Sequence, residues 1–330
     1  MIACGALAVT VAWLASRAIA APPTFVIVTL NGLTIAALYF VVASGFNLIF
    51  GLMRFVNMAH GSLYLLGGYV AFEVQQKLVG GNSAFISAGD VGITDWLLPL
   101  AAACGVVGLA GLVLHQVILR RAEGQELRQA VITIAVAVVL GDQMLAHFGG
   151  VAEDIRLPEW LERGVSLHVY GVTYSLFRLV VLAIAIQLGL ALVLLYRRTR
   201  FGTILRAGVD DREMVEAIGI NIQVVFAVAF GLGAVLAGLG GVLGGTMVAL
   251  APGEDSNFLL KALIVVIVGG LGSLAGSAVG ALALGLVEAY AQTYLVFGER
   301  NYTYLAILLT FGLLIVALAA RPEGLLRGRS

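Results

Sequence analysis

Residues 196–223, with the sequence YRRTRFGTILRAGVDDREMVEAIGINIQ, form the only long polar stretch that lies between two strongly apolar ones. The stretch contains five arginines, Arg197, Arg198, Arg200, Arg206 and Arg212. Cationic loops stay on the cytoplasmic side of a membrane, because translocating Lys and Arg is disfavoured. The stretch therefore predicts the orientation of the whole chain, with a cytoplasmic loop over residues 197–221.

A short helix is expected inside this loop, over about residues 211–218. Asp210 is an acidic N-cap candidate, Glu213 places a carboxylate near the positive end of the helix, and Gly219 is a helix stop. Met214, Val215 and Ile218 would form one apolar face, which a soluble partner protein can bind. The alternative is a solvated linker with a frayed turn.

The composition places the chain among integral membrane proteins. Of its 330 residues 61% are apolar and 12% charged, outside the range of soluble globular domains. Charge-free runs long enough to cross a bilayer recur, and segments in lipid must be helical to pair their own backbone groups. These runs are 18–53, 96–119, 217–253, 262–287 and 301–320. The expected fold is all-α, a polytopic transmembrane helical permease with about eight to nine membrane segments.

Two segments inside the apolar regions are predicted to be broken or re-entrant. Residues 45–61 mix Gly, Asn, Arg and His between two apolar helices. Residues 269–273, GGLGS, must form a bend, because the chain has to enter and return there if 304–320 is to end at cytoplasmic arginines. Paired discontinuous helices in the two halves of a chain indicate a substrate path.

The two ends of the chain carry separate expectations. Residues 1–21 are predicted to form an extra apolar membrane helix, with a signal segment as the alternative, and residues 22–330 form the permease domain. Arg321, Arg327 and Arg329 predict a cytoplasmic C-terminus. Small residues at four-residue spacing predict close helix packing, and these are Gly233, Gly241, Gly245, Gly272, Gly276 and Gly280.

The sequence argues against several other functions. Neither lysine, Lys77 or Lys261, belongs to a nucleotide-binding loop. The scattered His residues and the cysteines Cys4 and Cys104 supply neither a metal site nor a catalytic cluster. No metal, cofactor or nucleic-acid partner is therefore expected.

Five ionisable residues fall within apolar segments, where such groups are functional candidates by default. They are His60, Asp142, His147, Lys261 and Glu288. Asp142, Lys261 and Glu288 are predicted to extend toward nearby helix ends rather than to form a proton relay. His60 lies in the first bend, beside Asn57.

Several motifs together resemble the permease subunits of branched-chain amino-acid ABC importers, and more closely their H-type subunit. The most specific is the bend at residues 56–61, VNMAHG; the others are 31–32 NG, 37–39 ALY, 51–52 GL, 68–69 GY and 269–273 GGLGS. Residues 206–221 are similar to the family's ATPase-docking segment. The resemblance covers about residues 24–325, and Ser62 stands where many members carry Glu.

The resemblance implies a permease of a bacterial inner membrane that translocates branched-chain or related small apolar amino acids. The implied partners are an M-type permease subunit, two cytoplasmic ATPase subunits and a periplasmic binding protein. Residues near the bends are expected on the substrate path: Tyr39, Asn47, Asn57, His60 and Ser273. The expected ATPase-docking residues are Arg206, Asp210, Glu213, Met214, Val215, Ile218 and Gly219.

Three alternatives remain open from the sequence. Urea and short-amide ABC permeases share nearly the same pattern. A stand-alone ion-coupled carrier or channel would use Asp142 and Glu288 as coupling groups. A membrane-embedded enzyme would need clustered nucleophiles, bases or metal ligands.

Overall fold

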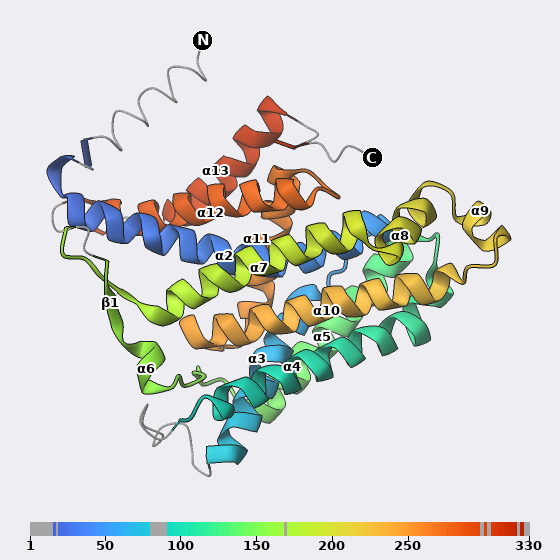
Figure 1. The fold of residues 1–330 in the computed structure, drawn as a ribbon, viewed down its shortest axis with the longest axis horizontal. Coiled ribbons are helices and arrows are strands. Elements are labelled where there is room, and N and C mark those ends of the chain that lie inside the picture. The colour runs from blue at the N-terminus through green and yellow to red at the C-terminus, as the bar shows by residue number, and fades with distance from the viewer. Residues whose placement is uncertain are drawn as a thin grey trace.

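A computed structural model describes residues 16, 17, 19–79, 91–167, 170–297, 300, 301, 305–321 and 324–326 of the chain. The described chain is a bundle of apolar helices with short strands at one end (Figure 1). The long helices are α2 (Pro22–Met53), α3 (His60–Val79), α4 (Thr94–Val113), α5 (Glu126–Phe148), α7 (Leu176–Arg198), α10 (Ile222–Met247), α11 (Glu254–Gly269), α12 (Leu274–Tyr294) and α13 (Leu305–Ala320).

Shorter elements complete the connections. A π-helical turn, Leu114–Ile118, and a 3₁₀ turn, Leu119–Ala122, extend α4. The remaining helices are α6 (Glu159–Glu162), α8 (Arg200–Asp210) and α9 (Arg212–Ala217). β1 (Gly164–Ser166) pairs antiparallel with β2 (Thr173–Ser175), and β3 (Val296–Phe297) with β4 (Arg300–Asn301).

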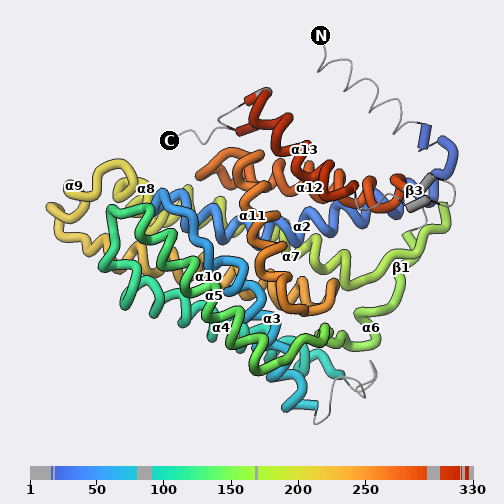
Figure 2. The backbone as a smooth tube through the Cα atoms, turned by 180° about the vertical axis from the view of Figure 1, so that it is seen from behind, coloured from blue at the N-terminus to red at the C-terminus, as the bar shows by residue number. Residues whose placement is uncertain are grey.

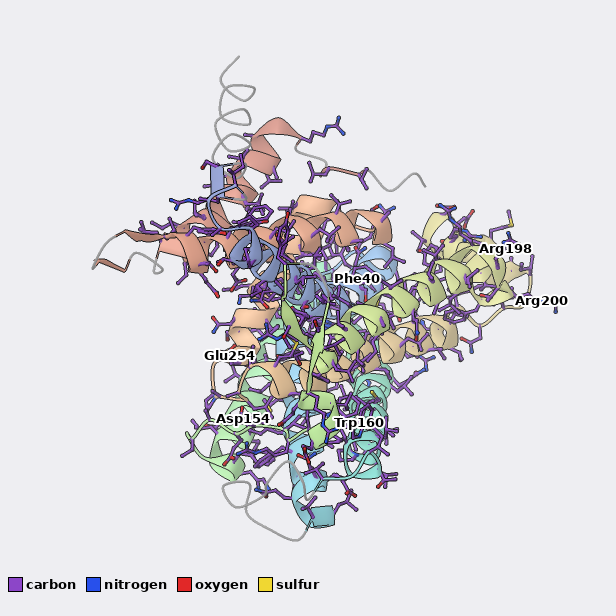
Figure 3. All side chains as sticks on the ribbon, turned by 60° about the vertical axis from the view of Figure 1, so that its left-hand side comes forward. Phe40, Asp154, Trp160, Arg198, Arg200 and Glu254 are labelled. Atoms are coloured by element: carbon purple, nitrogen blue, oxygen red, sulfur yellow. The ribbon has the colours of Figure 1, made fainter. Side chains whose placement is uncertain are left out.

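The bundle has two chemically different ends. We call the end that holds α8 and α9 the arginine end, and the end that holds α6 and the β1–β2 pair the hairpin end (Figure 1). Figure 3 shows Arg198 and Arg200 at one extremity, far from Asp154 and Trp160. The helices between these ends expose apolar side chains, as expected of surfaces that face lipid.

The centre of the bundle is formed by α2 and α10, most of whose residues are buried. α3 packs against α10 and α11 packs against α2, and α11 also contacts α3 and α12 (Figure 2). α5 and α7 are largely exposed along their length and flank this core. The fold is therefore all-α and polytopic, as predicted.

The predicted number of segments, eight to nine, is not confirmed. Six described helical stretches are long and apolar enough to cross a membrane: Pro22–Met53, Thr94–Ala122, Glu126–Phe148, Leu176–Arg198, Ile222–Met247 and Leu274–Tyr294. α3 and α11 do not meet that criterion, and Leu305–Ala319 is shorter. Most of the expected helix at residues 1–21 lies outside the described residues, as do Arg327 and Arg329.

The first predicted bend is shorter than expected, because α2 runs unbroken to Met53. Its glycine at position 45 packs against the carbonyl of Gly233 in α10, where an added Cβ would lie 2.5 Å from that oxygen. Gly45 thus serves helix packing and does not interrupt the helix. The chain turns only at Arg54, which adopts a left-handed conformation and donates its N–H to Phe50 O at 2.9 Å.

Glycines set the distance between several central helices. An added Cβ at Gly241 of α10 would collide with the Tyr64 carbonyl of α3, and one at Gly280 of α12 with the Val265 carbonyl of α11. Gly276 meets the backbone of Gly269 in the same way. The predicted packing residue Gly272 is different, because it precedes α12 and has φ +80° in the bend.

We expect Gly241→Ala to lower the stability of the purified protein by about 1–3 kcal/mol, because the added methyl overpacks against backbone that cannot move aside. Gly105 of α4 is the matched control, since a Cβ there meets nothing within 4 Å. Gly105→Ala should be neutral or stabilising by up to about 1 kcal/mol. Thermal unfolding in detergent measures both. Unchanged unfolding of Gly241→Ala would contradict the close approach of α10 and α3.

Candidate functional site

The first bend is held by its own polar side chains. Asn57 Oδ1 accepts the backbone N–H of Ala59 at 3.1 Å, immediately before α3 starts at His60. The His60 ring is fully buried; its Nε2 lies 3.0 Å from Val42 O of α2, and the ring packs edge-on against Phe46. His60 therefore joins α3 to α2, while Asn57 holds the bend itself.

Two polar atoms at this bend have unused hydrogen-bonding capacity. Asn57 Nδ2 and His60 Nδ1 are buried and have no hydrogen-bond partner among the described residues. Buried polar groups are normally paired. These two atoms are therefore exceptions to that pairing.

The second bend, between α11 and α12, is tied directly to α2. Asn47 Oδ1 accepts the N–H of Gly272 at 2.8 Å, and Ser273 caps α12 by accepting the N–H of Gly276 at 3.0 Å. The segment after α13 completes the bend, because Leu325 and Leu326 donate their N–H groups to Val268 O and Gly269 O at the end of α11. Backbone that is freed from helices at this depth is thus paired again within the chain.

The structure does not gather all five predicted path residues around one cavity. Asn47, Asn57, His60 and Ser273 are buried and bonded to backbone, and none of the cavities described below is lined by them. Tyr39 lies elsewhere: its hydroxyl donates to Glu288 Oε2. The proposal that the four bend residues contact a substrate stays a prediction.

Glu288, which Tyr39 contacts, forms an ion pair with Lys261 that the sequence analysis did not predict. Lys261 Nζ of α11 lies 3.1 Å from Glu288 Oε1 of α12. Tyr39, near the midpoint of the 32-residue α2, donates to the same carboxylate, and the pair is only partly buried. The expectation that Lys261 and Glu288 extend toward helix ends is wrong, because they pair across two helices. The glycine spacing could have indicated this pairing. Gly276 packs against Gly269 and Gly280 packs against Val265, and these contacts fix how α12 is aligned along α11.

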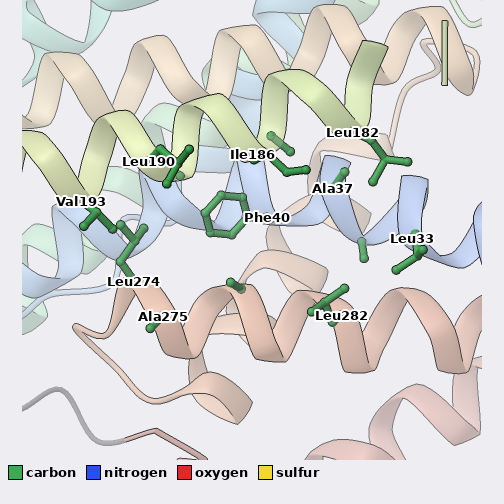
Figure 4. A pocket seen from close by; sticks show the side chains of 14 residues that line it. Leu33, Ala37, Phe40, Leu182, Ile186, Leu190, Val193, Leu274, Ala275 and Leu282 are labelled. Carbon is green, nitrogen blue, oxygen red and sulfur yellow. The ribbon is translucent and has the colours of Figure 1, made fainter. Parts of the chain in front are cut away.

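Three cavities among the helices differ in the charge of the side chains that line them. One of 330 Å³ between α2, α7 and α12 is walled by apolar side chains such as Phe40, Leu182 and Leu190 (Figure 4). A second, of 410 Å³, has the carboxylates of Asp142 and Asp255. The third, of 710 Å³, lies between α11, α12 and α13 and contains Lys261 and Glu288. Of the three, only the third has charges of both signs.

The polar segment at the arginine end folds into two helices, not one. Residues 200–210, expected as loop, form α8, which Thr199 caps through Gly202 N–H at 3.1 Å. Asp211, and not Asp210, is the N-cap of α9, and it accepts Met214 N–H at 2.9 Å. The predicted cap was one residue early because both aspartates fit the pattern, and Asp210 ends α8.

The expected apolar face of α9 is divided between core and surface. Met214 is 61% exposed and Ile218 is 69% exposed, whereas Val215 is buried with Ile222 and Phe226. Glu213 is exposed beside them. Val215 therefore anchors α9, and Met214 and Ile218 are what a partner can reach.

Two other predicted docking residues, Arg206 and Gly219, contribute to the local structure around α8 and α9. Arg206 donates to Tyr196 O, and its guanidinium lies 5.7 Å from the centre of the Tyr196 ring. Gly219 adopts φ +87° at the turn after α9, a conformation that favours glycine. Both residues therefore help to set the conformation of the α8–α9 segment, in which Met214 and Ile218 are exposed.

Ionic contacts fix α9 to the membrane helices. Arg212 lies 2.8 Å from Glu123, which follows the last turn of the α4 stretch, and 3.1 Å from Glu216. Partial burial lowers the pKa of Arg212, but hydrogen bonds to Glu123 and Glu216 raise it more, so its pKa lies above its ordinary value. Gln223 donates to the same Glu123 carboxylate at 3.0 Å. Glu123 therefore connects α9 to both the α4 stretch and α10.

No group of three or more His, Cys, Asp or Glu residues that could hold a metal ion occurs in the described part of the chain.

Comparisons with known proteins give a consistent result. Residues 28–318 match the family described as "Branched-chain amino acid transport system / permease component". The chain is 30% identical over 300 residues to the high-affinity branched-chain amino acid transport system permease protein BraD of Pseudomonas aeruginosa, covering 90% of this chain and 94% of that protein. It is 29% identical over 307 residues to LivH of Escherichia coli (strain K12), covering 90% and 93%. A probable LivH of Methanocaldococcus jannaschii is 26% identical over 86% of each chain. No solved structure matches.

We expect Asn47→Leu to destabilise the protein by about 0.5–1.5 kcal/mol, because the N–H of Gly272 loses the acceptor of a partly buried hydrogen bond. Gln187→Leu is the control, since that amide is exposed on α7. Thermal unfolding of the two purified variants measures the difference. If Asn47→Leu unfolds like the control, the Asn47–Gly272 hydrogen bond does not hold the second bend.

Proposed function

This chain belongs to the family of permease components of branched-chain amino acid transport systems, and we propose that it translocates branched-chain or related small apolar amino acids through a bacterial inner membrane. The family is a permease component of ABC importers. It is not an enzyme, and ATP hydrolysis belongs to separate ATPase subunits. The carrier, channel and enzyme alternatives are therefore set aside.

The names of the relatives support the choice of substrate. BraD and LivH are named for high-affinity branched-chain amino acid transport, not for urea or short amides. The match spans more than nine-tenths of each of these two relatives. A branched-chain amino acid is the substrate that this likeness favours.

The observation that carries the mechanism is the anchored helix α9. It presents exposed Met214 and Ile218 while Val215 and the Arg212–Glu123 pair hold it to the bundle. An external ATPase needs an apolar contact that is rigidly connected to the transmembrane helices. We assign this role to α8 and α9, with Glu213 and Asp210 at the rim.

The orientation and the partners follow from that assignment. The arginine end, with α8, α9 and the segment after α13, faces the cytoplasm, in accord with the positive-inside rule. The complex contains an M-type permease subunit, two cytoplasmic ATPase subunits and a periplasmic binding protein. The hairpin end receives the binding protein.

The double substitution Met214→Ser and Ile218→Ser is expected to reduce recovery of the ATPase with the permease by at least about tenfold, because two exposed apolar side chains that the bound ATPase would cover are lost. Uptake of L-leucine falls with it, while the unfolding temperature of the permease stays unchanged, since both side chains are exposed. Val151→Ser, at the hairpin end and 69% exposed, is the control.

Co-purification and uptake in intact cells measure these effects. If the double variant keeps its ATPase and its uptake, α9 is not the docking helix. If Val151→Ser alone loses the ATPase, the orientation is the reverse of the one proposed.

A further inference from the structure

The largest of the three cavities combines charged, polar and apolar walls. Lys261, Glu288, Asn257, Gln292 and Thr310 contribute polar groups to its 710 Å³. The rest of the wall is apolar, with side chains of α11 and α13 such as Ile264, Ile307 and Phe311. Ligand sites for small molecules have this combination of apolar walls with a few convergent polar groups.

The Lys261–Glu288 pair is surrounded by groups that keep each charge in place. Gln292 Nε2 donates to Glu288 Oε1 at 3.2 Å, and the Tyr39 hydroxyl donates to Oε2. The Lys261 ammonium lies 5.1 Å from the centre of the Tyr39 ring and 5.6 Å from that of Phe258. Aromatic faces attract a cation, so the ammonium is held even when its carboxylate partner moves.

Both charges remain accessible from the cavity. The side chain of Lys261 is 29% exposed and that of Glu288 is 13% exposed. A charged pair near the middle of a membrane bundle is costly to bury, and by itself it is weak support for stability. Such residues usually face a water-filled cavity or a substrate pathway.

We propose that the Lys261–Glu288 pair binds the charged end of a zwitterionic α-amino acid, an inference that rests on the proposed function. The substrate ammonium takes the place of Lys261 at the Glu288 carboxylate, beside the hydroxyl of Tyr39. The substrate carboxylate then pairs with the Lys261 ammonium, and the aliphatic side chain lies on the apolar wall.

The exchange conserves charge inside the bundle. One ion pair separates and two form, and each lysine, carboxylate and ammonium keeps its proton count. The site therefore carries no net charge either empty or filled, which keeps the cost of occupancy low at membrane depth. The apolar cavity of Figure 4 offers neither charge, and the cavity at Asp142 and Asp255 offers only negative charge.

The variants Glu288→Gln and Lys261→Met each remove one charge of the site, and three probe ligands show which charged group of the ligand that charge binds. The full-length permease is co-purified with its own partner subunits, without the binding protein, and reconstituted in lipid nanodiscs. The probes are L-leucine, 4-methylpentanoate, which lacks the ammonium, and 3-methylbutylamine, which lacks the carboxylate. Equilibrium binding is measured for each.

Glu288→Gln is expected to weaken L-leucine binding by about tenfold or more, because a charge-assisted contact is lost, and to leave 4-methylpentanoate binding undiminished. Lys261→Met is expected to weaken L-leucine equally and to spare 3-methylbutylamine. A pair with a merely structural role would weaken all three probes together or none, and either result overturns the proposal.

The other lysine of the chain supplies a matched control. Lys77 pairs with Glu73 one turn earlier on α3, at 2.6 Å, with 73% of the lysine side chain exposed. Lys77→Met and Glu73→Gln should bind L-leucine like the wild type. If the Lys261 or Glu288 variant does not fold, Gln292→Leu keeps both charges and should weaken L-leucine by about twofold to tenfold; unchanged binding contradicts the site.

The outcomes also separate this inference from the proposed function. A wild-type transporter that neither binds nor transports L-leucine rejects the substrate class. A wild-type transporter that binds L-leucine while the Lys261 and Glu288 variants behave like the Lys77 control rejects only the Lys261–Glu288 site.

Discussion

Backbone that leaves a helix inside a bilayer has no water to pair with, and this constraint explains the polar residues at the two bends. Asn57 accepts the N–H of Ala59 in the first bend, Ser273 caps α12, and Asn47 accepts an N–H from the second bend. Residues 324–326 cover the carbonyls at the end of α11. Two contacts tie the bends to α2: Asn47 accepts the N–H of Gly272, and His60 Nε2 lies 3.0 Å from Val42 O.

The polar groups at the bends and the charged groups that line a cavity lie in different parts of the bundle. Most polar groups at the bends are engaged with backbone, and the charges of opposite sign that line one cavity, Lys261 and Glu288, lie along α11 and α12. Close packing of glycine in α12 against α11 brings these two helices near enough for the pair to form. Helix packing, charge pairing and the cavity are therefore consequences of one interface.

The arginine end is built as a connected module and not as a loose loop. Val215 fixes α9 in a small apolar core, while Arg212 joins it to Glu123 and Glu216. In a family whose ATP hydrolysis takes place in separate subunits, motion has to enter the permease from outside. Under the proposed docking role, α9 is where that motion would enter, since Glu123 connects it to the α4 stretch and α10.

The sequence by itself determined the class of the protein. Long charge-free runs require membrane helices, and the motifs at residues 56–61 and 269–273 marked the bends, because composition, capping and glycine position are local properties. It did not reveal that α2 continues through Gly45, that residues 200–210 are helical, or that Val215 points inward while Met214 is exposed. Those features depend on which helix lies opposite each residue. Only the tertiary structure decided that Lys261 meets Glu288, because the register between two helices follows from packing that no single segment encodes.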